Sequence, residues 1–433
     1  MIQPIQGVPY VPGVAAGPVR FGSNARAAEI MVIQAADLSV LRGEPAGIVV
    51  VDGAPLSHAM LRLFSIGCPA VSLDAEQSAA LQEGTRVLLD GSSGLIRGAG
   101  PDEQPCALHA PESAGRVETV DGTPVELRAS VSNAQGAALA RERRAAALGL
   151  VRSEYLEPAS GTVPDEPFYR ASLDALCRAA APLPVTVRLA DFGVSKRPAW
   201  LPATTAAQPL GFQGVRWFDQ EPVASVVRAQ VRAMARLSGQ WDLRLLLPFV
   251  TGPEECIRWR DWAEAQLPAP VPIGAMAETP AAIFAMAELL EVTEFVAIGC
   301  NDLMQGLFEA DRDLPAMRSV LNPYAPAVFR CLRIAADLAG NGLERVQVCG
   351  LLPQLPSVLP VLIGLGFRAY SVEPMLLPWL AATVSRTDAM VSGALARSVC
   401  AAPDAASVRR LLELEAAGPW RPVRRPAHDS YSG

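Results

Sequence analysis

Charged side chains recur at the ends of short apolar segments in the C-terminal part of the 433-residue chain. Glu278 and Asp302 each follow such a segment, and two carboxylates on adjacent strands suit an octahedral Mg²⁺ with open positions for substrate oxygens. Arginines that can form bidentate hydrogen bonds with phosphate or carboxylate end three other segments: Arg152, Arg188 and Arg216. These residues indicate a small, strongly anionic, metal-chelating substrate. The alternative is that they only stabilise the rim of the fold.

Imidazole chemistry has few candidates, because the chain contains 3 histidines: His58, His109 and His428. His58 follows the buried-strand pattern Gly47–Val51 and a tight turn, and the apolar run 59–66 after it predicts a helix. A histidine at the start of a helix can accept a phosphoryl group, since helix N-termini stabilise phosphate. A structural role is the more usual one for a lone histidine, and it stays open here.

Three further residues stand out by position or rarity. Asn301 and Cys349 also lie at predicted strand ends. Lys196 is the one lysine of the chain, in which lysine and arginine together number 37.

These candidate residues need a scaffold that gathers the ends of strands. From residue 119 onward, short apolar segments alternate with helical stretches rich in Ala, Leu, Arg and Glu. The alternation predicts an α/β fold, a (β/α)₈ TIM barrel, in which chemistry occurs at the carboxyl ends of the strands. The predicted strands are 125–131, 149–152, 185–189, 214–217, 243–248, 271–277, 295–298 and 345–349.

Composition shifts predict the other boundaries. Residues 1–98 form a separate Gly- and Val-rich domain, and 99–118 form a linker without periodicity, which contains His109. The barrel spans 119–400. Residues 401–433 form a C-terminal helix and a frayed tail with His428.

Composition also excludes several classes of protein. With 50% hydrophobic residues, 19% charged residues and a net charge of −7, the chain is globular and has no basic run for nucleic acid. The N-terminus has no signal-peptide pattern, and the most apolar stretch is too interrupted to span a membrane. The 8 cysteines include no C-x-x-C pair, which argues against zinc and favours reduced thiols in the cytoplasm.

The ordered motifs resemble a known family, the phosphoenolpyruvate (PEP)-utilising enzymes. This family includes enzyme I of the bacterial sugar phosphotransferase system, pyruvate phosphate dikinase and phosphoenolpyruvate synthase. The segment after residue 52, GAPLSHAMLRLFSIGCPAVS, is similar to the phosphohistidine motif of the family's swivelling domain. The barrel motifs follow in the family's order and include LGLVRSEYLE, VTVRLADFGVSK, GFQGVRWF, IGAMAETPAA, FVAIGCNDLMQGLFEADRD and VQVCG.

The resemblance implies roles for individual residues. Residues 1–98 would be the phosphohistidine swivel domain, with His58 as the phosphoryl carrier, and Cys349 would donate a proton to the enolate carbon. Glu278 and Asp302 would bind Mg²⁺. The substrate-binding residues would be Arg152, Arg188, Arg216, Asn301, Arg312 and Lys196.

The function implied by the resemblance is a phosphotransferase that moves a phosphoryl group between PEP or pyruvate and His58. The second phosphoryl donor or acceptor would be a separate protein or a small molecule, because only about 30 residues separate the opening motif from Gly47 and leave no room for the carrier-docking insert of enzyme I. A homodimer is expected from the resemblance alone.

Departures from the family pattern leave two alternatives open. Leu56 and Phe64 replace a threonine and an arginine near the carrier histidine, and Leu351 replaces a glutamate after Cys349. One alternative is an enzyme that uses only the barrel on a related oxo-acid. The other is a non-catalytic protein that senses PEP or pyruvate.

Overall fold

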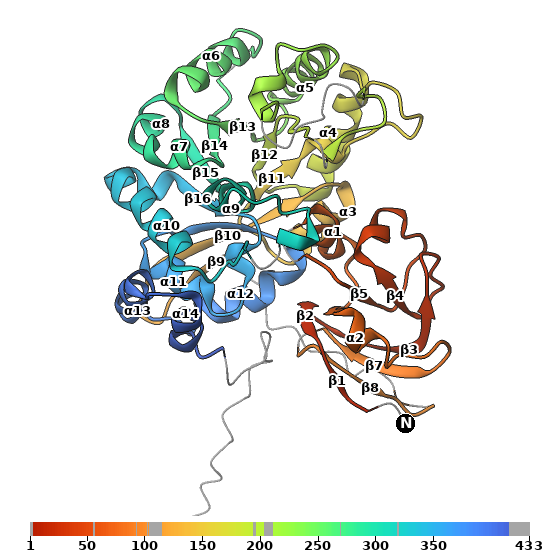
Figure 1. Ribbon diagram of the computed structural model, residues 1–433. Coiled ribbons are helices and arrows are strands. Elements are labelled where there is room, and N and C mark those ends of the chain that lie inside the picture. The colour runs from red at the N-terminus through yellow and green to blue at the C-terminus, as the bar shows by residue number, and fades with distance from the viewer. Residues whose placement is uncertain are drawn as a thin grey trace, which may run out of the picture. The chain divides into compact units, whose positions relative to one another are not determined.

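The computed structural model describes most of the chain, which divides into two compact units (Figure 1). The described residues are 3–54, 57–91, 93–101, 103, 115–193, 196–202, 211–268, 270–317 and 320–414. Within them, residues 3–103 and 412–414 belong to the first unit, and 115–411 to the second. No helix of the described residues is long and apolar enough to cross a membrane.

The second unit is a closed barrel of parallel strands, which confirms the predicted fold class. Eight strands pair in sequence order, and the last closes the ring by pairing with the first. Their residues are almost entirely buried and apolar, as expected for a parallel sheet covered on both faces. The strands are β10 (Pro124–Val131), β11 (Leu148–Arg152), β12 (Val185–Arg188), β13 (Leu243–Val250), β14 (Ile273–Ala277), β15 (Phe295–Gly299), β16 (Val346–Cys349) and β17 (Ala369–Val372).

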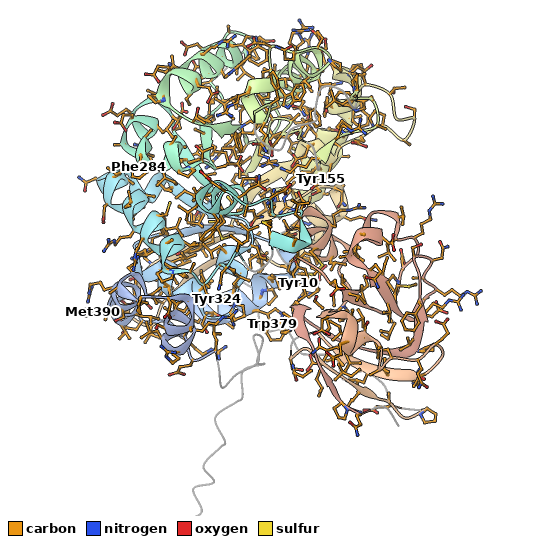
Figure 2. The ribbon with its side chains drawn as sticks, in the orientation of Figure 1. Tyr10, Tyr155, Phe284, Tyr324, Trp379 and Met390 are labelled. Carbon is orange, nitrogen blue, oxygen red and sulfur yellow. The ribbon has the colours of Figure 1, made fainter. Side chains whose placement is uncertain are left out.

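Helices connect these strands and cover the barrel. Some of them begin at a side-chain cap: Asn133 accepts a hydrogen bond from Gly136 N at 2.7 Å, and Asp165 accepts one from Phe168 N at 2.9 Å. The helices are α3 (Ala134–Glu142), α4 (Glu166–Ala180), α5 (Val223–Leu237), α6 (Pro253–Glu264), α7 (Pro280–Phe284), α8 (Met286–Val292), α9 (Cys300–Phe308), α10 (Pro326–Ala339), α11 (Val358–Gly364), α12 (Leu377–Val384), α13 (Ala389–Ala401) and α14 (Ala405–Leu411). Several large apolar side chains stay exposed on the outer helices, among them Phe284 of α7 and Met390 of α13 (Figure 2).

One strand prediction is wrong, and one barrel strand was not predicted. Residues 214–217 form a 3₁₀ helix, η5 (Gly214–Trp217), and not the fourth strand. Gly214 adopts φ +50°, and an added Cβ would lie 2.7 Å from the carbonyl oxygen of Pro248, so this segment is a tight turn against β13. The missing strand is β17, which lies in the apolar stretch between two helices.

This difference changes which barrel strand precedes each predicted site residue. Glu278 follows the fifth strand instead of the sixth, and Asn301 and Asp302 follow the sixth instead of the seventh. Cys349 ends the seventh strand, and Glu373 follows the eighth.

The first unit is built on one mixed sheet with the order β1-β8-β7-β3-β4-β5-β6-β2. Its apolar core includes Val32, Val49, Val71 and Leu89. The predicted helix after His58 is present as α1 (His58–Ile66), and α2 spans Ala75–Ser78. The assignment of this unit as a phosphohistidine domain stays a prediction. The strands are β1 (Ile5–Gln6), β2 (Val8–Val11), β3 (Val14–Phe21), β4 (Ile30–Gln34), β5 (Gly47–Val51), β6 (Ala70–Leu73), β7 (Arg86–Asp90) and β8 (Leu95–Gly98).

Candidate active site

The carboxyl ends of the barrel strands carry a group of charged and polar residues. Parallel strands end at the same face of a barrel, so side chains at these ends share what we call the carboxyl-end face. Most of the predicted site residues lie on it, together with one residue that the sequence analysis did not select, Glu373. The residues are Arg152, Arg188, Glu278, Asn301, Asp302, Cys349 and Glu373.

Arg188 is buried and surrounded by carboxylates. Its guanidinium forms ion pairs with Glu154 and with Asp191 at 3.2 Å, and it lies 4.0 Å from Glu278. Burial opposes the charge of Arg188, but Glu154 and Asp191 outweigh that effect and raise its pKa. Arg188 is therefore a fixed positive charge on the carboxyl-end face.

Lys196 joins the same group of charges. Its Nζ donates to Asp191 Oδ2 at 2.5 Å, and its side chain is largely buried. Burial alone would lower the pKa of Lys196, but the charge of Asp191 raises it. Asp191 thus bridges Lys196 and Arg188.

Glu278 is the most deeply buried of the predicted metal ligands, with a side chain that is 1% exposed. Its Oε1 accepts a hydrogen bond from Phe249 N at 3.1 Å. Burial raises the pKa of Glu278 well above its usual range, and the negative charges of Asp302 and Asp191 raise it further. Gly299 is packed against this side chain, since an added Cβ would lie 2.5 Å from Glu278 Oε2.

Arg312 supports Asp302. One terminal nitrogen of the guanidinium lies 3.0 Å from Asp302 Oδ1 and 3.1 Å from Oδ2. The side chain of Arg312 is 2% exposed and that of Asp302 is 13% exposed. Asp302 is therefore the more accessible of the two carboxylates predicted to bind Mg²⁺.

Asn301 connects the ends of the sixth and seventh strands, and Cys349 is the last residue of the seventh. Asn301 Oδ1 accepts a hydrogen bond from Leu351 N at 3.0 Å, beside Gly350, whose φ is +95°. Burial raises the pKa of the Cys349 thiol to about 12, while the charges of Arg128 and Arg188 act in the opposite direction. Cys349 therefore keeps its proton at neutral pH.

Arg152 and Arg216 lie outside the ion pairs of Arg188. Arg152 forms its own ion pair with Glu373, at 2.6 Å. Arg216 is an exposed residue of η5, donates to the carbonyl oxygen of Gly211 at 3.1 Å and lies 5.4 Å from the ring centroid of Phe249. Arg216 is thus adjacent to the residue whose N–H binds Glu278.

The sequence analysis did not select the acidic partners of the arginines: Glu154, Asp191 and Glu373. Glu154 stands two residues after Arg152, and Asp191 three residues after Arg188, so both had a positional signal. Glu373 had none, because the strand before it was not predicted.

His58 lies in the first unit, as the first residue of α1 after strand β5. Ser57 caps this helix by accepting a hydrogen bond from Met60 N at 3.4 Å. The backbone therefore has the predicted arrangement of a histidine at a helix N-terminus. His109 and His428 lie outside the described residues.

Comparison with known proteins identifies the family. The model of the family described as "PEP-utilising enzyme, PEP-binding domain" matches residues 109–389, which include all eight strands of the barrel. This chain belongs to the PEP-utilising enzymes.

Curated PEP-utilising relatives resemble most of this chain. A phosphoenolpyruvate-protein phosphotransferase of Haloferax volcanii is 30% identical over 86% of this chain and 68% of its own length. Multiphosphoryl transfer proteins of Xanthomonas campestris and Rhodobacter capsulatus are each 31% identical, over 77% and 91% of this chain. The chain spans only 42% and 50% of the length of these two relatives. The Haloferax relative carries the name of the predicted enzyme class, the PEP-dependent phosphotransferases.

Glu278 and Asp302 fit a magnesium ion in this PEP-utilising barrel. Across the described part of the chain, no group of three or more His, Cys, Asp and Glu residues is arranged to hold a metal. Mg²⁺ does not need such a group, because it is usually bound by one or two carboxylates plus water and substrate phosphate. Burial and the negative charge of Asp302 raise the pKa of Glu278, and a divalent cation would favour its charged form.

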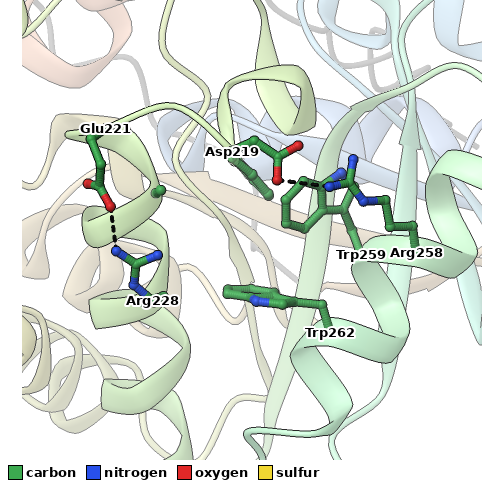
Figure 3. A pocket seen from close by; sticks show the side chains of 8 residues that line it. Asp219, Glu221, Arg228, Arg258, Trp259 and Trp262 are labelled. Carbon is green, nitrogen blue, oxygen red and sulfur yellow. Dashed lines mark hydrogen bonds and ion pairs between the residues drawn. The ribbon is translucent and has the colours of Figure 1, made fainter.

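A separate groove of about 360 Å³ lies on the outside of the barrel, between α5 and α6 (Figure 3). Trp259 and Trp262 form its apolar wall. Two exposed ion pairs lie at the groove, Arg228 with Glu221 at 2.5 Å and Arg258 with Asp219 at 2.8 Å. No predicted site residue lines this groove.

Proposed function

We propose that this chain is a Mg²⁺-dependent phosphotransferase that moves a phosphoryl group between PEP or pyruvate and His58. The observation that supports this proposal is the buried group of charges on the carboxyl-end face. Within it, Arg188, Lys196 and Arg312 are fixed cations, and Glu278 and Asp302 are carboxylates that follow the neighbouring strands β14 and β15. Fixed cations stabilise the dispersed negative charge of a transferring phosphoryl group.

The arginines would bind the two anionic groups of the substrate. Arg188 and Arg312 are held by acidic partners and need little rearrangement when a phosphate or carboxylate arrives. Arg152 is more accessible and Asn301 lies at the start of α9, so both are suited to contact substrate. Arg216 would act from the edge of the same site.

In the forward direction, the bridging P–O bond of PEP breaks and a P–N bond to the His58 imidazole forms. The electron pair of the broken bond remains on the enolate oxygen. Cys349 then gives its S–H proton to the enolate carbon, which yields pyruvate, and the thiolate regains a proton from water. A thiol with a pKa of about 12 is protonated before this step, as a general acid must be.

Glu278 and Asp302 would hold the metal ion, which supplies Lewis-acid stabilisation of the enolate and phosphoryl oxygens when bound. Glu278 lies 4.0 Å from the guanidinium of Arg188, so this carboxylate and the cation proposed to bind phosphate are neighbours.

The second half-reaction would use a separate phosphoryl carrier protein or small molecule. The relatives named phosphoenolpyruvate-protein phosphotransferase support a protein partner. The seven described cysteines form no disulfide with one another, which supports a reducing compartment such as the cytoplasm. A homodimer remains part of the proposal.

The test is incubation of the full chain with ³²P-labelled PEP and Mg²⁺, followed by intact mass measurement. We expect an acid-labile phosphoryl adduct on the wild type and on the control variant His428→Ala, but not on His58→Ala. Omitting Mg²⁺ should abolish the adduct.

Two other outcomes would contradict the proposal. Pyruvate release that survives His58→Ala would favour an enzyme that uses only the barrel. PEP binding without adduct or turnover would favour a sensor.

A further inference from the structure

Glu373 lies on the carboxyl-end face and contacts an arginine predicted to bind substrate. It follows β17, and its Oε1 accepts a hydrogen bond from the terminal nitrogen of Arg152 at 2.6 Å. The side chain of Glu373 is 4% exposed, whereas that of Arg152 is 19% exposed. A buried carboxylate therefore holds the accessible guanidinium.

The backbone of Glu373 is fixed by a neighbouring side chain. Glu373 N donates to Gln354 Oε1 at 2.9 Å, and Gln354 Nε2 donates to the carbonyl oxygen of Gly350 at 2.7 Å. These bonds connect the ends of the seventh and eighth strands. The Glu373 carboxylate thus lies at a defined place beside Arg152.

Arg152 is more exposed than Arg188 and Arg312, the two other arginines of this site that form ion pairs. The side chains of Arg188 and Arg312 are 5% and 2% exposed, so Arg152 is the one of the three that a ligand reaches most readily. An anion that approaches Arg152 meets the negative charge of Glu373 at the same guanidinium. Like charges that are brought together in a poorly solvated site repel strongly.

On the basis of the proposed function, we propose that Glu373 determines substrate specificity by occupying Arg152. A highly charged ligand such as PEP must displace or tolerate the Glu373 carboxylate. Pyruvate carries a single charge, and its carboxylate can use the remaining arginines. Glu373 therefore disfavours PEP relative to pyruvate and shifts binding toward the less charged ligand.

The test compares the binding of PEP and of pyruvate to the full chain by calorimetry in Mg²⁺. Glu373→Gln keeps the size of the side chain and an oxygen that can accept from Arg152, but it removes the charge. We expect this variant to bind PEP at least about tenfold more tightly, and pyruvate less than about threefold more tightly. The control Glu126→Gln removes a carboxylate from another ion pair, with Arg128 at 2.8 Å near the start of β10, and should change neither affinity.

Two further variants keep the test decisive. Glu373→Ala also removes the charge, and it adds no amide that could disturb the site. It should therefore show the same gain in PEP affinity. Arg152→Ala combined with Glu373→Gln should cancel the gain, because the effect acts through Arg152. Thermal unfolding of each variant identifies any that fails to fold.

The outcomes separate this inference from the proposed function. If the wild type binds PEP and both Glu373 variants bind it with equal or lower affinity, the specificity role is overturned and the proposed phosphotransferase function is not. No PEP binding by the wild type or by either variant would overturn both.

Discussion

The thiol of Cys349 shows how burial sets the chemistry of a single residue. Its side chain belongs to the apolar cluster inside the barrel that includes Leu246 and Met276. Burial raises its pKa to about 12, so the thiol keeps its proton at neutral pH and is not a thiolate nucleophile. The same position would be a poor site for thiolate chemistry and is a suitable one for delivering a proton to a carbon atom.

Cys349→Ala should separate proton delivery from phosphoryl transfer. We expect the His58 adduct to form from PEP as in the wild type, because the alanine leaves the arginines and carboxylates in place. Proton exchange at the pyruvate methyl group should fall by about 10²–10⁴, the usual contribution of a general acid. NMR of pyruvate incubated with the protein in D₂O measures this exchange.

The control for this prediction is Cys300→Ala, which removes a neighbouring buried thiol at the start of α9. That variant should exchange protons at the wild-type rate. Equal exchange by Cys349→Ala and the wild type would remove Cys349 from the reaction.

Sequence reasoning at the residue scale works for side chains at strand ends and fails for their partners. Arg188 and Glu278 were selected because each follows an apolar segment. Glu154 and Asp191 also lie just after apolar segments, but nothing in the sequence distinguishes them from surface acids. Only the fold shows that both form ion pairs with the guanidinium of Arg188. Which charged residues form ion pairs depends on their distance in the folded structure, and residue type alone does not give that distance.

At the scale of elements, helix α5 fixes the position of Arg188 from outside the barrel. Gln230 of α5 is fully buried, accepts a hydrogen bond from Ala190 N at 2.9 Å and donates one to Ser153 Oγ at 2.9 Å. Ser153 Oγ in turn donates to the carbonyl oxygen of Arg188 at 2.6 Å. One amide thus ties the loops after β11 and β12 to each other.

Gln230→Leu should weaken ligand binding although the residue lies outside the carboxyl-end face. The change leaves Ala190 N and Ser153 Oγ without this partner, which should lower the free energy of unfolding by about 1–3 kcal/mol. Because the loop that carries Arg188 loses a tether, the KM for PEP should rise more than kcat falls. Steady-state kinetics and urea unfolding measure both effects.

Arg232→Gln is the matched control on the same helix, because Arg232 is exposed. It should leave both KM and stability near the wild-type values. If Gln230→Leu lowers stability but leaves the KM for PEP unchanged, Gln230 stabilises the fold and does not affect ligand binding.

The elements themselves were predictable where the hydrophobic pattern was unambiguous. Seven of the eight barrel strands overlap predicted segments, because each is a short buried run bounded by turn residues. Strand β17 was hidden in a long apolar stretch in which α11 and α12 are equally apolar, so strand and helix could not be told apart. Residues 214–217 have a strand-like composition, but Gly214 with φ +50° turns them into η5.

At the scale of the whole molecule, the composition makes the dependence of stability on alkaline pH unusual. Lysines normally titrate above pH 9, but this chain has one lysine and relies on arginine for positive charge. In the unfolded chain its thiols are therefore the main groups that change charge between pH 8 and 9.5. Burial raises the pKa of most described cysteines, to about 12 for Cys177 and Cys256 and to about 11 for Cys331.

This pattern predicts a loss of stability as pH rises. In the unfolded chain a thiol loses its proton near pH 8.5, whereas in the folded chain a buried thiol keeps it. Between these pKa values the unfolded state binds fewer protons, so the free energy of unfolding falls with increasing pH. Each buried thiol contributes at most about 1.4 kcal/mol per pH unit.

Urea unfolding between pH 8 and 9.5 tests this prediction, and Cys256→Ala assigns part of it. Cys256 of α6 is fully buried, so its removal should make the decline in stability with pH less steep. Val226→Ala creates a similar small cavity on α5 without removing a thiol, and it should lower stability by a constant amount at every pH. Parallel curves for Cys256→Ala and the wild type would mean that the buried thiols do not set the alkaline limit of this fold.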